Sequence, residues 1–344
     1  MAKTASTASR KADHIRINLE EDVSSNLTTG LEYYRFLHQA LPELDLEAID
    51  FEQVIFSRAV RLPLLISSMT GGTEEAGRIN RNLAEAAQEA GIAMGLGSQR
   101  AALEDESLAQ SFSVRRYAPD ILLLANLGAV QLNYGYTVEH CKRAVDMVAA
   151  DALILHFNAM QEAVQPEGDT RFSGLLARVE AVCRALPVPV IAKEVGWGFS
   201  GRAARQLADA GVQAIDVAGA GGTSWSQVEK FRLSDERQAQ VAALFRGWGI
   251  PTSDSIQMVR EAAPELLVFA SGGLRNGLDI AKCIALGACL GGMAGPFLKA
   301  AAVSCEAVKD MIWQVRRELQ ISMFGAGAGS INALQHTPLL KISG

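Results

Sequence analysis

Short apolar runs alternate with longer amphipathic segments from about Leu62 to the end of the chain. Eight of these runs are almost continuously apolar, and each ends in small or polar residues. Runs of this kind are typical of parallel strands that are buried on both faces. The pattern therefore predicts eight parallel strands, which are Leu64–Ser68, Ala93–Gly97, Ile121–Asn126, Ala152–Asn158, Pro189–Val195, Ala214–Ala218, Leu266–Ser271 and Cys289–Met293.

The segments between these runs have helical periodicity. The clearest of them are Glu74–Ala90, Thr137–Ala149, Phe172–Ala185, Ser200–Ala210 and about Asn276–Leu286. Strands that alternate with helices indicate βα units and a parallel sheet. Eight such units favour closure into a (β/α)8 TIM barrel. An open doubly wound sheet is the competing fold, but no GxGxxG motif follows the first strand.

The rest of the chain reads as additions to this barrel. Residues 1–9 are small and polar and are predicted to form a disordered tail. Residues 31–58 contain a short helix candidate and a strand, Val54–Ser57, which we expect to cover the bottom of the barrel. A long helix, Ala300–Ile321, and a Gly/Ala tail close the chain. Residues 10–344 contain no Pro- or Ser-rich linker, so we expect one domain.

Composition narrows the class of protein. The chain has 344 residues, of which 49% are apolar and 20% charged, and this suits a single barrel with a large core. The net charge of −6 gives no basic field for nucleic acid. The five cysteines form no CxxC pair, and we expect them to be small core residues of a protein in a reducing compartment. No run approaches about 18 apolar residues, and the N-terminus lacks an apolar signal region, so we expect a cytoplasmic protein without a membrane span.

Two glycine turns near the end of the chain suggest a phosphate site. One strand run ends in Ser271-Gly272-Gly273, and the next ends in Ala294-Gly295-Pro296. Glycines at a strand end let backbone N–H groups approach an anion, and a helix that starts there adds its positive end. The glycines would also suit tight βα turns alone. The doubled turn, with Arg275 beside it, favours a phosphate site like the one after strands 7 and 8 of a (β/α)8 barrel.

The residues at the strand ends form a polar ring with one lysine and several amides and glycines. The ring contains no Cys/His metal cluster and no Ser-His-Asp set. A flavin mononucleotide (FMN) fits this ring, with its phosphate in the last two turns and its ring rim on hydroxyls and amides of the first three strand ends. Lys193 would stand near the electron-rich ring edge, where a cation stabilises reduced, anionic flavin. Alternatively, Lys193 is a barrel-interior lysine paired with a carboxylate.

The fourth strand leads into the sequence HFNAMQEAVQPEGD. His156 and Asn158 lie two residues apart and therefore face the same side of the strand. Glu162 supplies a carboxylate beside the expected phosphate, a combination that suits Mg²⁺. The part from Gln165 onward reads mostly as a turn. Before the barrel, the Arg10-Lys11 pair is either a solvated basic patch or an arm that folds over a phosphate-bearing ligand.

These motifs together resemble type 2 isopentenyl-diphosphate isomerase, the FMN-dependent form. The resemblance extends from about Arg10 to the last helix and includes several long, specific motifs. They are RKADH, SSMTGG, GLGSQR, HFNAMQE with QPEGD, AKEVGWG, GAGGTSW with Glu229 four residues after Trp225, and SGGLRNG with MAGPF.

The resemblance assigns roles to particular residues. The diphosphate of the substrate would bind Arg10, Lys11, Ser98, Gln99 and Arg100. Gln161 would lie near the reacting carbons and contact the substrate, and Glu162 would be the Mg²⁺ ligand. Further active-site positions are His14, His156, Trp225 and Glu229. FMN would be bound by Ser68, Met69, Thr70, Ser98, Asn126, Lys193, Thr223, Gly272, Gly273, Leu274, Arg275, Ala294 and Gly295.

The resemblance also implies the reaction, which is the interconversion of isopentenyl and dimethylallyl diphosphate in isoprenoid biosynthesis. Reduced FMN would act as acid and base, NADPH would only reduce it, and Trp225 would shield a cation-like centre. Assembly into a homo-oligomer, a tetramer or an octamer, is expected.

Two rival functions remain open at this stage. One is an FMN-dependent oxidoreductase of the 2-hydroxyacid oxidase or inosinate dehydrogenase kind. The sequence after strand seven is Leu274-Arg275-Asn276 and lacks the histidine base of a hydroxyacid oxidase, and Gly219–Trp225 lacks the cysteine nucleophile of inosinate dehydrogenase. The other rival is a non-catalytic flavin- or phosphate-binding scaffold, which would not need Arg10, Lys11, Gln161 or Glu162.

Overall fold

The protein is described by a computed structural model that covers residues 7–342, with side chains from residue 13 onward. Its centre is a closed barrel of eight parallel strands in the order β10-β11-β4-β5-β6-β7-β8-β9. The strands are β4 (Leu64–Ile66), β5 (Ala93–Gly95), β6 (Leu123–Gly128), β7 (Ala152–His156), β8 (Val190–Lys193), β9 (Ala214–Asp216), β10 (Leu267–Ala270) and β11 (Leu290–Met293). The predicted (β/α)8 barrel is confirmed. Seven strands lie within their predicted runs, and β6 begins and ends two residues later than predicted.

The strands are buried on both faces because the core has two layers. Alternate residues point inward, so Leu65, Leu124 and Phe269 pack inside the barrel. Their neighbours Leu64 and Ile66 pack outward against the helices in the larger cluster. The near-continuous apolar runs follow from this arrangement, since every strand position faces apolar surface.

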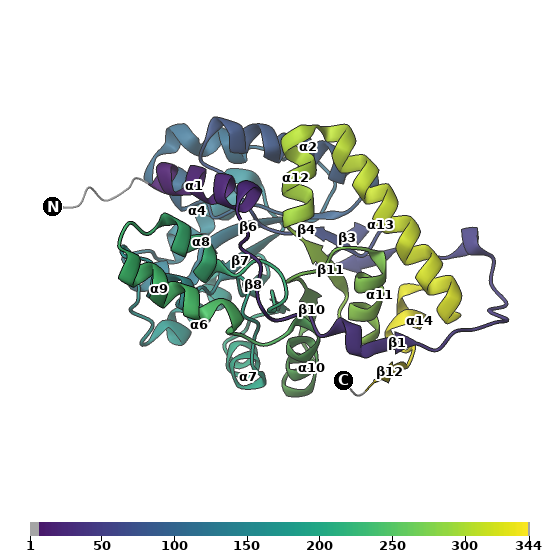
Figure 1. Cartoon of the computed structure of the whole chain (residues 1–344). Helices are drawn as coiled ribbons and strands as arrows, with labels where there is room; N and C mark the ends of the chain where they lie inside the picture. The colour runs from purple at the N-terminus through teal and green to yellow at the C-terminus, as the bar shows by residue number, and fades with distance from the viewer. Residues whose placement is uncertain (1–6, 343–344) are drawn as a thin grey trace.

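Helices surround the barrel (Figure 1). The main helices that follow strands are α2 (Glu74–Ala90), α4 (Val138–Val148), α6 (Leu175–Ala185), α7 (Gly201–Asp209), α10 (Thr252–Ala262) and α11 (Gly277–Ala285). The α2 helix shows how the sequence sets such bounds. The Thr73 side chain accepts a hydrogen bond from the N–H of Ala76, and Gly91 ends the helix in the left-handed region. Shorter helices near the strand ends are α3 (Arg100–Glu104), α5 (Ala159–Val164), α8 (Trp225–Arg232) and α9 (Glu236–Leu244).

A small hairpin closes the amino-terminal end of the barrel. It consists of β2 (Gln53–Ile55) and β3 (Arg58–Val60), which pair antiparallel. Ile55 and Val60 are buried against the inner barrel layer. The expectation that the segment around Val54 covers the bottom of the barrel is therefore confirmed.

The two ends of the chain compare differently with the predictions. The helix α1 (Thr7–Glu20) begins within the predicted disordered tail of residues 1–9, and residues 1–6 lie outside the described residues, so the disorder of the tail stays a prediction. The long helix predicted over Ala300–Ile321 is two helices, α12 (Gly295–Val303) and α13 (Cys305–Ala326). Ser304 separates them because it is extended (φ −167°) and caps α13 by accepting from the N–H of Ala307.

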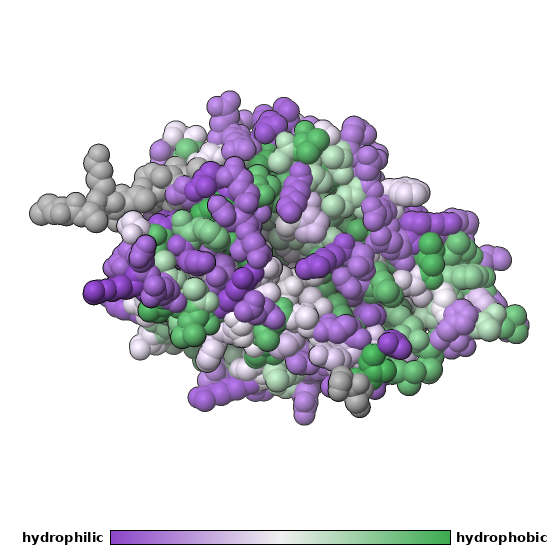
Figure 2. All heavy atoms as spheres, in the orientation of Figure 1, coloured by the Kyte–Doolittle hydropathy of each residue, from purple (hydrophilic) through white to green (hydrophobic). Residues whose placement is uncertain are grey.

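The chain ends are organised by contacts that periodicity did not reveal. After α14 (Ile331–Gln335), β12 (Leu339–Lys341) pairs antiparallel with β1 (Tyr34–Phe36). Hydrophilic residues cover much of the face in Figure 2, and hydrophobic residues gather toward the side that holds β1 and β12. Within the described part of the chain, no helix combines the length and apolar character needed to cross a membrane.

Candidate active site

A cavity lies at the carboxyl ends of strands β4 to β8. Its walls come from consecutive strand ends and from the helices α1, α5 and α8, which pass over this end of the barrel. The lining residues that the sequence predicted are His14, Ser68, Met69, Ser98, Arg100, Asn126, His156, Gln161, Glu162, Lys193 and Trp225. Residues from widely separated segments therefore meet at one place, as a barrel active site requires.

Lys193 is 7% exposed at the end of β8 and is held by three groups. Its Nζ lies 3.1 Å from Oδ2 of Asp216 and donates to Oγ of Ser271 (3.3 Å) and to the carbonyl of Glu194 (3.2 Å). Ser271 Oγ in turn donates to Oδ1 of Asp216 at 2.5 Å. The interpretation of Lys193 as a barrel-interior lysine paired with a carboxylate is therefore confirmed. The lysine also lines the cavity, as the predicted contact with a flavin ring would require.

Glu194, next to this lysine, is buried and fixes the loop after β8. Its Oε2 accepts from the backbone N–H groups of Val195 (2.6 Å), Gly196 (2.8 Å) and Trp197 (2.6 Å). Burial raises the pKa of Glu194 to about 7, although these three N–H donors and Lys193 act in the opposite direction. This loop presents Val195 to the cavity.

The polar groups on the β4–β7 side are suited to a flavin ring. Asn126 Oδ1 lies 2.8 Å from Nδ1 of His156, and this contact orients both side chains. Ser68 Oγ is buried and has no hydrogen-bond partner among the described residues. A buried, unpaired hydroxyl costs free energy unless a ligand satisfies it. The residues present therefore fit a polar-rimmed cofactor such as FMN.

The two glycine turns lie side by side because β10 and β11 pair in parallel. Gly272 and Gly273 have φ values of 104° and 78°, and a Cβ on Gly272 would lie 2.1 Å from the carbonyl oxygen of Gly219. Only glycine fits this approach. Ala294 precedes α12, whose first residue Gly295 is exposed with open space at its Cβ position. A turn and a helix start with open space suit a phosphate.

Arg275 is arranged differently from the glycines beside it. Its side chain is exposed, and its backbone N–H donates to Oδ2 of Asp279 at 3.0 Å. The Asn276 side chain accepts from the N–H of Asp279, so the first turn of α11 is already capped. Of the two helix starts at this pair of turns, the start of α12 has no side-chain cap and is therefore the one suited to an anion.

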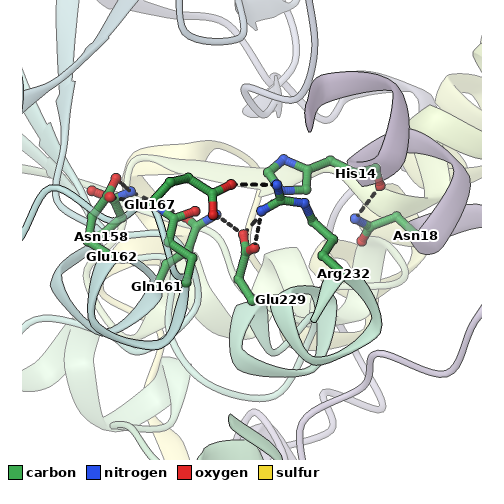
Figure 3. A network of polar contacts seen from close by, with 9 residues as sticks. His14, Asn18, Asn158, Gln161, Glu162, Glu167, Glu229 and Arg232 are labelled. Carbon is green, nitrogen blue, oxygen red and sulfur yellow. Dashed lines mark hydrogen bonds and ion pairs between the residues drawn. The ribbon is translucent and has the colours of Figure 1, made fainter. Parts of the chain in front are cut away.

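A chain of hydrogen bonds runs along one wall of the cavity (Figure 3). Gln161 Nε2 donates to Oε1 of Glu229 at 2.8 Å, and Gln161 Oε1 accepts from Nδ2 of Asn158 at 3.3 Å. Asn158 Nδ2 also donates to Oε1 of Glu162 at 2.8 Å. The carboxamide of Gln161 thus has one orientation, since its nitrogen needs an acceptor and its oxygen a donor.

Glu229 lies at one end of this chain and is fully buried. Its Oε1 is 3.1 Å from Nε2 of His14, and its Oε2 accepts from Arg232. Burial alone raises the pKa of Glu229, but the hydrogen bond and charge of His14, together with Arg232 and Gln161, lower it to about 2. Glu229 does not line the cavity; it holds His14 and Gln161, which do.

Glu162 lies at the other end, 6% exposed. Its Oε2 accepts from the side chain of Gln165 and from the backbone N–H of Asp169 (2.7 Å). No group of three or more His, Cys, Asp or Glu side chains that could hold a metal occurs among the described residues. A cation at Glu162 would therefore need oxygen ligands from a bound molecule or water, as Mg²⁺ commonly has.

Some predicted residues are not brought to the cavity. Gln99 is fully buried beneath it, where its amide donates to the carbonyl of Ala144 (2.7 Å) and accepts from the N–H of Asn126 (3.0 Å). Thr70 is buried outside the lining, and Thr223 Oγ1 bonds Asn18 of α1 at 3.5 Å. Arg10 and Lys11 belong to α1, but their side chains lie outside the described residues.

Other residues at the site were not predicted. Gln131 and Gln165 line the cavity, and Asp169 accepts from both Gln131 (3.0 Å) and Arg100 (3.0 Å). The segment from Gln165 onward is a turn, as predicted, since the N–H of Gly168 donates to the carbonyl of Gln165 (3.2 Å), and it also forms part of the site wall. The only sequence signal for this part of the wall was the pair of carboxylates in QPEGD. The spacing of the sequence does not show with which distant arginine each carboxylate forms an ion pair.

Comparison with known proteins gives relatives over almost the whole chain. The sequence model of the family described as FMN-dependent dehydrogenase matches residues 136–341. A protein of Nostoc sp. named isopentenyl-diphosphate delta-isomerase is 53% identical, over 98% of this chain and 97% of its own. Proteins of the same name from Synechocystis sp. (97% and 96% covered) and Rickettsia bellii (96% and 96%) are 55% and 52% identical.

Solved structures give the same fold at lower identity. A mandelate oxidase variant with 4-Br-2-hydroxy-methylphenylacetate superposes with a TM-score of 0.68 at 20% identity, covering 98% of this chain and 100% of that one. A mandelate oxidase variant with a monooxide FMN adduct gives a TM-score of 0.65 at 19% identity, covering 98% and 93%. At this identity the likeness establishes the barrel fold alone.

Proposed function

The chain belongs to the isopentenyl-diphosphate delta-isomerase family, and on that premise we propose that it interconverts isopentenyl diphosphate and dimethylallyl diphosphate, with reduced FMN as cofactor, in isoprenoid biosynthesis. The observation that carries the proposal is the composition of one cavity. Lys193, suited to a flavin ring, and the Gln161–Glu162 pair, suited to a diphosphate substrate, line the same space. A flavin oxidase would not need the second set.

We assign the cofactor to the strand ends and glycine turns. Its phosphate would bind at Gly272, Gly273 and the start of α12, and Ser68 and Asn126 would hydrogen-bond the ring rim. Thr70 and Thr223 would contribute only after local rearrangement. When bound, reduced FMN would supply the acid and base for moving the alkene proton. Its reductant would be NADPH.

The diphosphate would occupy the opposite side of the cavity. Ser98 and Arg100 line it, and Arg10 and Lys11 lie on α1, whose His14 reaches the same space. Arg100 already pairs with Glu104 and Asp169, so binding would exchange one of these partners for phosphate oxygens. Glu162 would bind Mg²⁺ together with those oxygens and water.

The hydrocarbon end would lie near Gln161 and Trp225. The rings of Trp225 and His14 pack in a T-shaped arrangement, with centroids 5.1 Å apart at 76°, so α8 and α1 meet at the cavity wall. An aromatic face excludes water and favours positive charge that develops on carbon. Gln161, fixed between Asn158 and Glu229, would position the reacting carbons.

The test is a turnover assay under argon with purified protein, FMN and Mg²⁺. Oxidised enzyme should be nearly inactive, and after reduction by NADPH it should form many molecules of dimethylallyl diphosphate per NADPH consumed. Chelation of Mg²⁺ should abolish turnover, and its return should restore it. One NADPH consumed per product would instead identify an oxidoreductase. A colourless protein that cannot be reconstituted with FMN would remove the cofactor assignment.

The second candidate function is a flavin-dependent oxidoreductase that acts on 2-hydroxy acids, which the match of residues 136–341 to the FMN-dependent dehydrogenase family favours. It predicts reduction of the bound flavin by a 2-hydroxy acid and hydrogen peroxide formation in air. Mixing the oxidised protein anaerobically with mandelate and following the flavin absorbance separates the two functions directly.

A further inference from the structure

Arg232, at the end of α8, does not line the cavity and yet bonds two carboxylates from different segments. One terminal nitrogen, Nη1, donates to Oε2 of Glu229. The other, Nη2, donates to Oε1 of Glu167 at 2.6 Å, in the loop after α5. The side chain is only 8% exposed, so the guanidinium is held in place by these partners (Figure 3).

The contact with Glu229 matters because of what Glu229 does with its other oxygen. Oε1 accepts from Gln161 and meets His14. A fully buried carboxylate keeps its charge only beside cations and donors. Without Arg232, a proton on Glu229 would turn one acceptor oxygen into a donor. The carboxamide of Gln161 could then rotate, and α1 would lose a partner for His14.

We infer that Arg232 is a positioning residue for the proposed isomerisation: by pairing with Glu229 it keeps that carboxylate an acceptor, and this fixes the orientation of Gln161 and the docking of His14 over the cavity. The inference rests on the proposed function, since it gives Gln161 a role beside the reacting carbons. Arg232 itself touches neither substrate nor cofactor in this account.

The contact with Glu167 gives the arrangement a second anchor. Glu167 is followed by Gly168 and Asp169, and Asp169 bonds Glu162 through its backbone and Arg100 through its carboxylate. Arg232 thus joins α8 to the loop that supports Glu162. The two contacts of Arg232 should differ in their effect on activity, because only Glu229 is hydrogen-bonded to Gln161.

The experiment is a double-mutant cycle between Arg232→Met and Glu229→Gln, measured as kcat and KM with FMN bound and reduced. Arg232→Met should lower kcat about tenfold to a hundredfold, because a charge-assisted bond to a buried group is lost. In the Glu229→Gln background the same change should have less than about a threefold effect, because Arg232 acts through Glu229. FMN absorbance and affinity should stay unchanged.

Matched controls separate positioning from general stabilisation. Arg205→Met removes another ion-paired arginine, on α7 and outside the cavity lining, and should leave kcat unaltered. Glu167→Gln keeps the cation at Glu229 and should cost less activity than Arg232→Met. If Arg232→Met does not fold, Arg232→Lys replaces it in the cycle. We then expect a smaller loss of kcat, and again a smaller effect in the Glu229→Gln background than in wild type.

Two results would overturn the inference. Equal losses from Arg232→Met with and without Glu229→Gln would mean that the arginine acts independently of Glu229. A lower melting temperature with wild-type kcat would mean that it only stabilises the fold. Failure of the proposed function looks different, since wild-type protein with reduced FMN would then form no dimethylallyl diphosphate.

Discussion

At the residue scale, the charge of Lys193 is balanced by a buried carboxylate. Asp216 is 1% exposed and lies 3.1 Å from Nζ, and Ser271 bonds both groups. A ligand in the cavity therefore meets a lysine–aspartate pair and not an isolated cation. The strand position of Lys193 was predictable from sequence, but its partner was not, because Asp216 lies on the next strand and becomes a neighbour only through the pairing of β8 with β9.

This pair predicts opposite effects on the reduction potential of bound FMN. Lys193→Ala should weaken binding of reduced FMN more than of oxidised FMN, since the cation attracts the charged form more. Asp216→Asn should strengthen the binding of reduced FMN relative to oxidised FMN. We expect the ratio of the two affinities to change by roughly tenfold, or about 1.4 kcal/mol. Spectroelectrochemical titration of the three proteins checks this. A potential that moves in the same direction in both variants would contradict it.

Glu194 predicts a pH dependence of stability. Its pKa in the folded protein is about 7, above the ordinary 4.5, because the group is buried. The folded state thus holds this proton more tightly than the unfolded chain, and the stabilisation is full below pH 4.5 and lost as pH rises to about 7. At about 1.36 kcal/mol per pKa unit, the loss is at most roughly 3 kcal/mol.

The measurement is urea unfolding of wild type and Glu194→Gln between pH 4.5 and 7.5. The difference in unfolding free energy between them should change across this window, with wild type losing more as pH rises. The carboxamide introduced by Glu194→Gln can still accept from the loop N–H groups through its oxygen, but it does not titrate. Parallel curves for the two proteins would show that Glu194 is ionised throughout.

At the scale of elements, local signals were reliable and long-range ones were absent. Apolar runs predicted each strand, and the Thr73 cap agrees with the predicted start of α2. The break between α12 and α13 was missed because a single serine interrupts an otherwise helical pattern. The turn after α5 was predicted, but its ion pairs with Arg100 and Arg232 were not, because they join residues far apart in the sequence.

This loop predicts the behaviour of a glycine variant. A Cβ at Gly168 would lie 1.8 Å from the carbonyl oxygen of Glu162, so Gly168→Ala must displace the loop and its N–H bond to that carboxylate. The Mg²⁺ concentration for half-maximal activity should rise about tenfold, as for loss of a support around a metal ligand. Glu162→Gln should raise it further, while FMN affinity stays constant. Unchanged Mg²⁺ dependence in both variants would remove Glu162 from the metal site.

At the scale of the molecule, the barrel was predictable because the strand–helix pattern repeats eight times along the sequence. The positions of exposed apolar side chains on the surface were less predictable. Exposed apolar side chains occur on α9 and the turn after it, where Leu244 is 79% and Trp248 57% exposed, and on α13, where Trp313 is 68% exposed. Apolar side chains mark protein interfaces where they gather into a contiguous patch, whereas single exposed ones are ordinary.

We propose self-association and expect a mass above that of one 36.7 kDa chain in light scattering after size-exclusion chromatography. Leu244→Glu or Trp313→Glu should lower this mass, because each would place a charge in an apolar contact. Lys142→Glu, at an exposed polar position on α4, serves as a control. A monomeric wild-type protein at micromolar concentration would rule out a stable oligomer.

The pairing of β1 with β12 has a consequence for how the chain can be cut and rejoined. Tyr34 and Lys341 are cross-strand partners, so the two ends of the chain between them lie side by side and this part of the chain forms a nearly closed ring. Helix α1 and the segment that follows it lie outside that ring. The helix is held by contacts such as that of His14 with Glu229, and the segment by the bond from the N–H of Ser25 to the carbonyl of Gly222. A circularly permuted gene that joins the two ribbon strands directly should preserve the barrel, and the α1 segment becomes a detachable cover that could be supplied as a separate peptide.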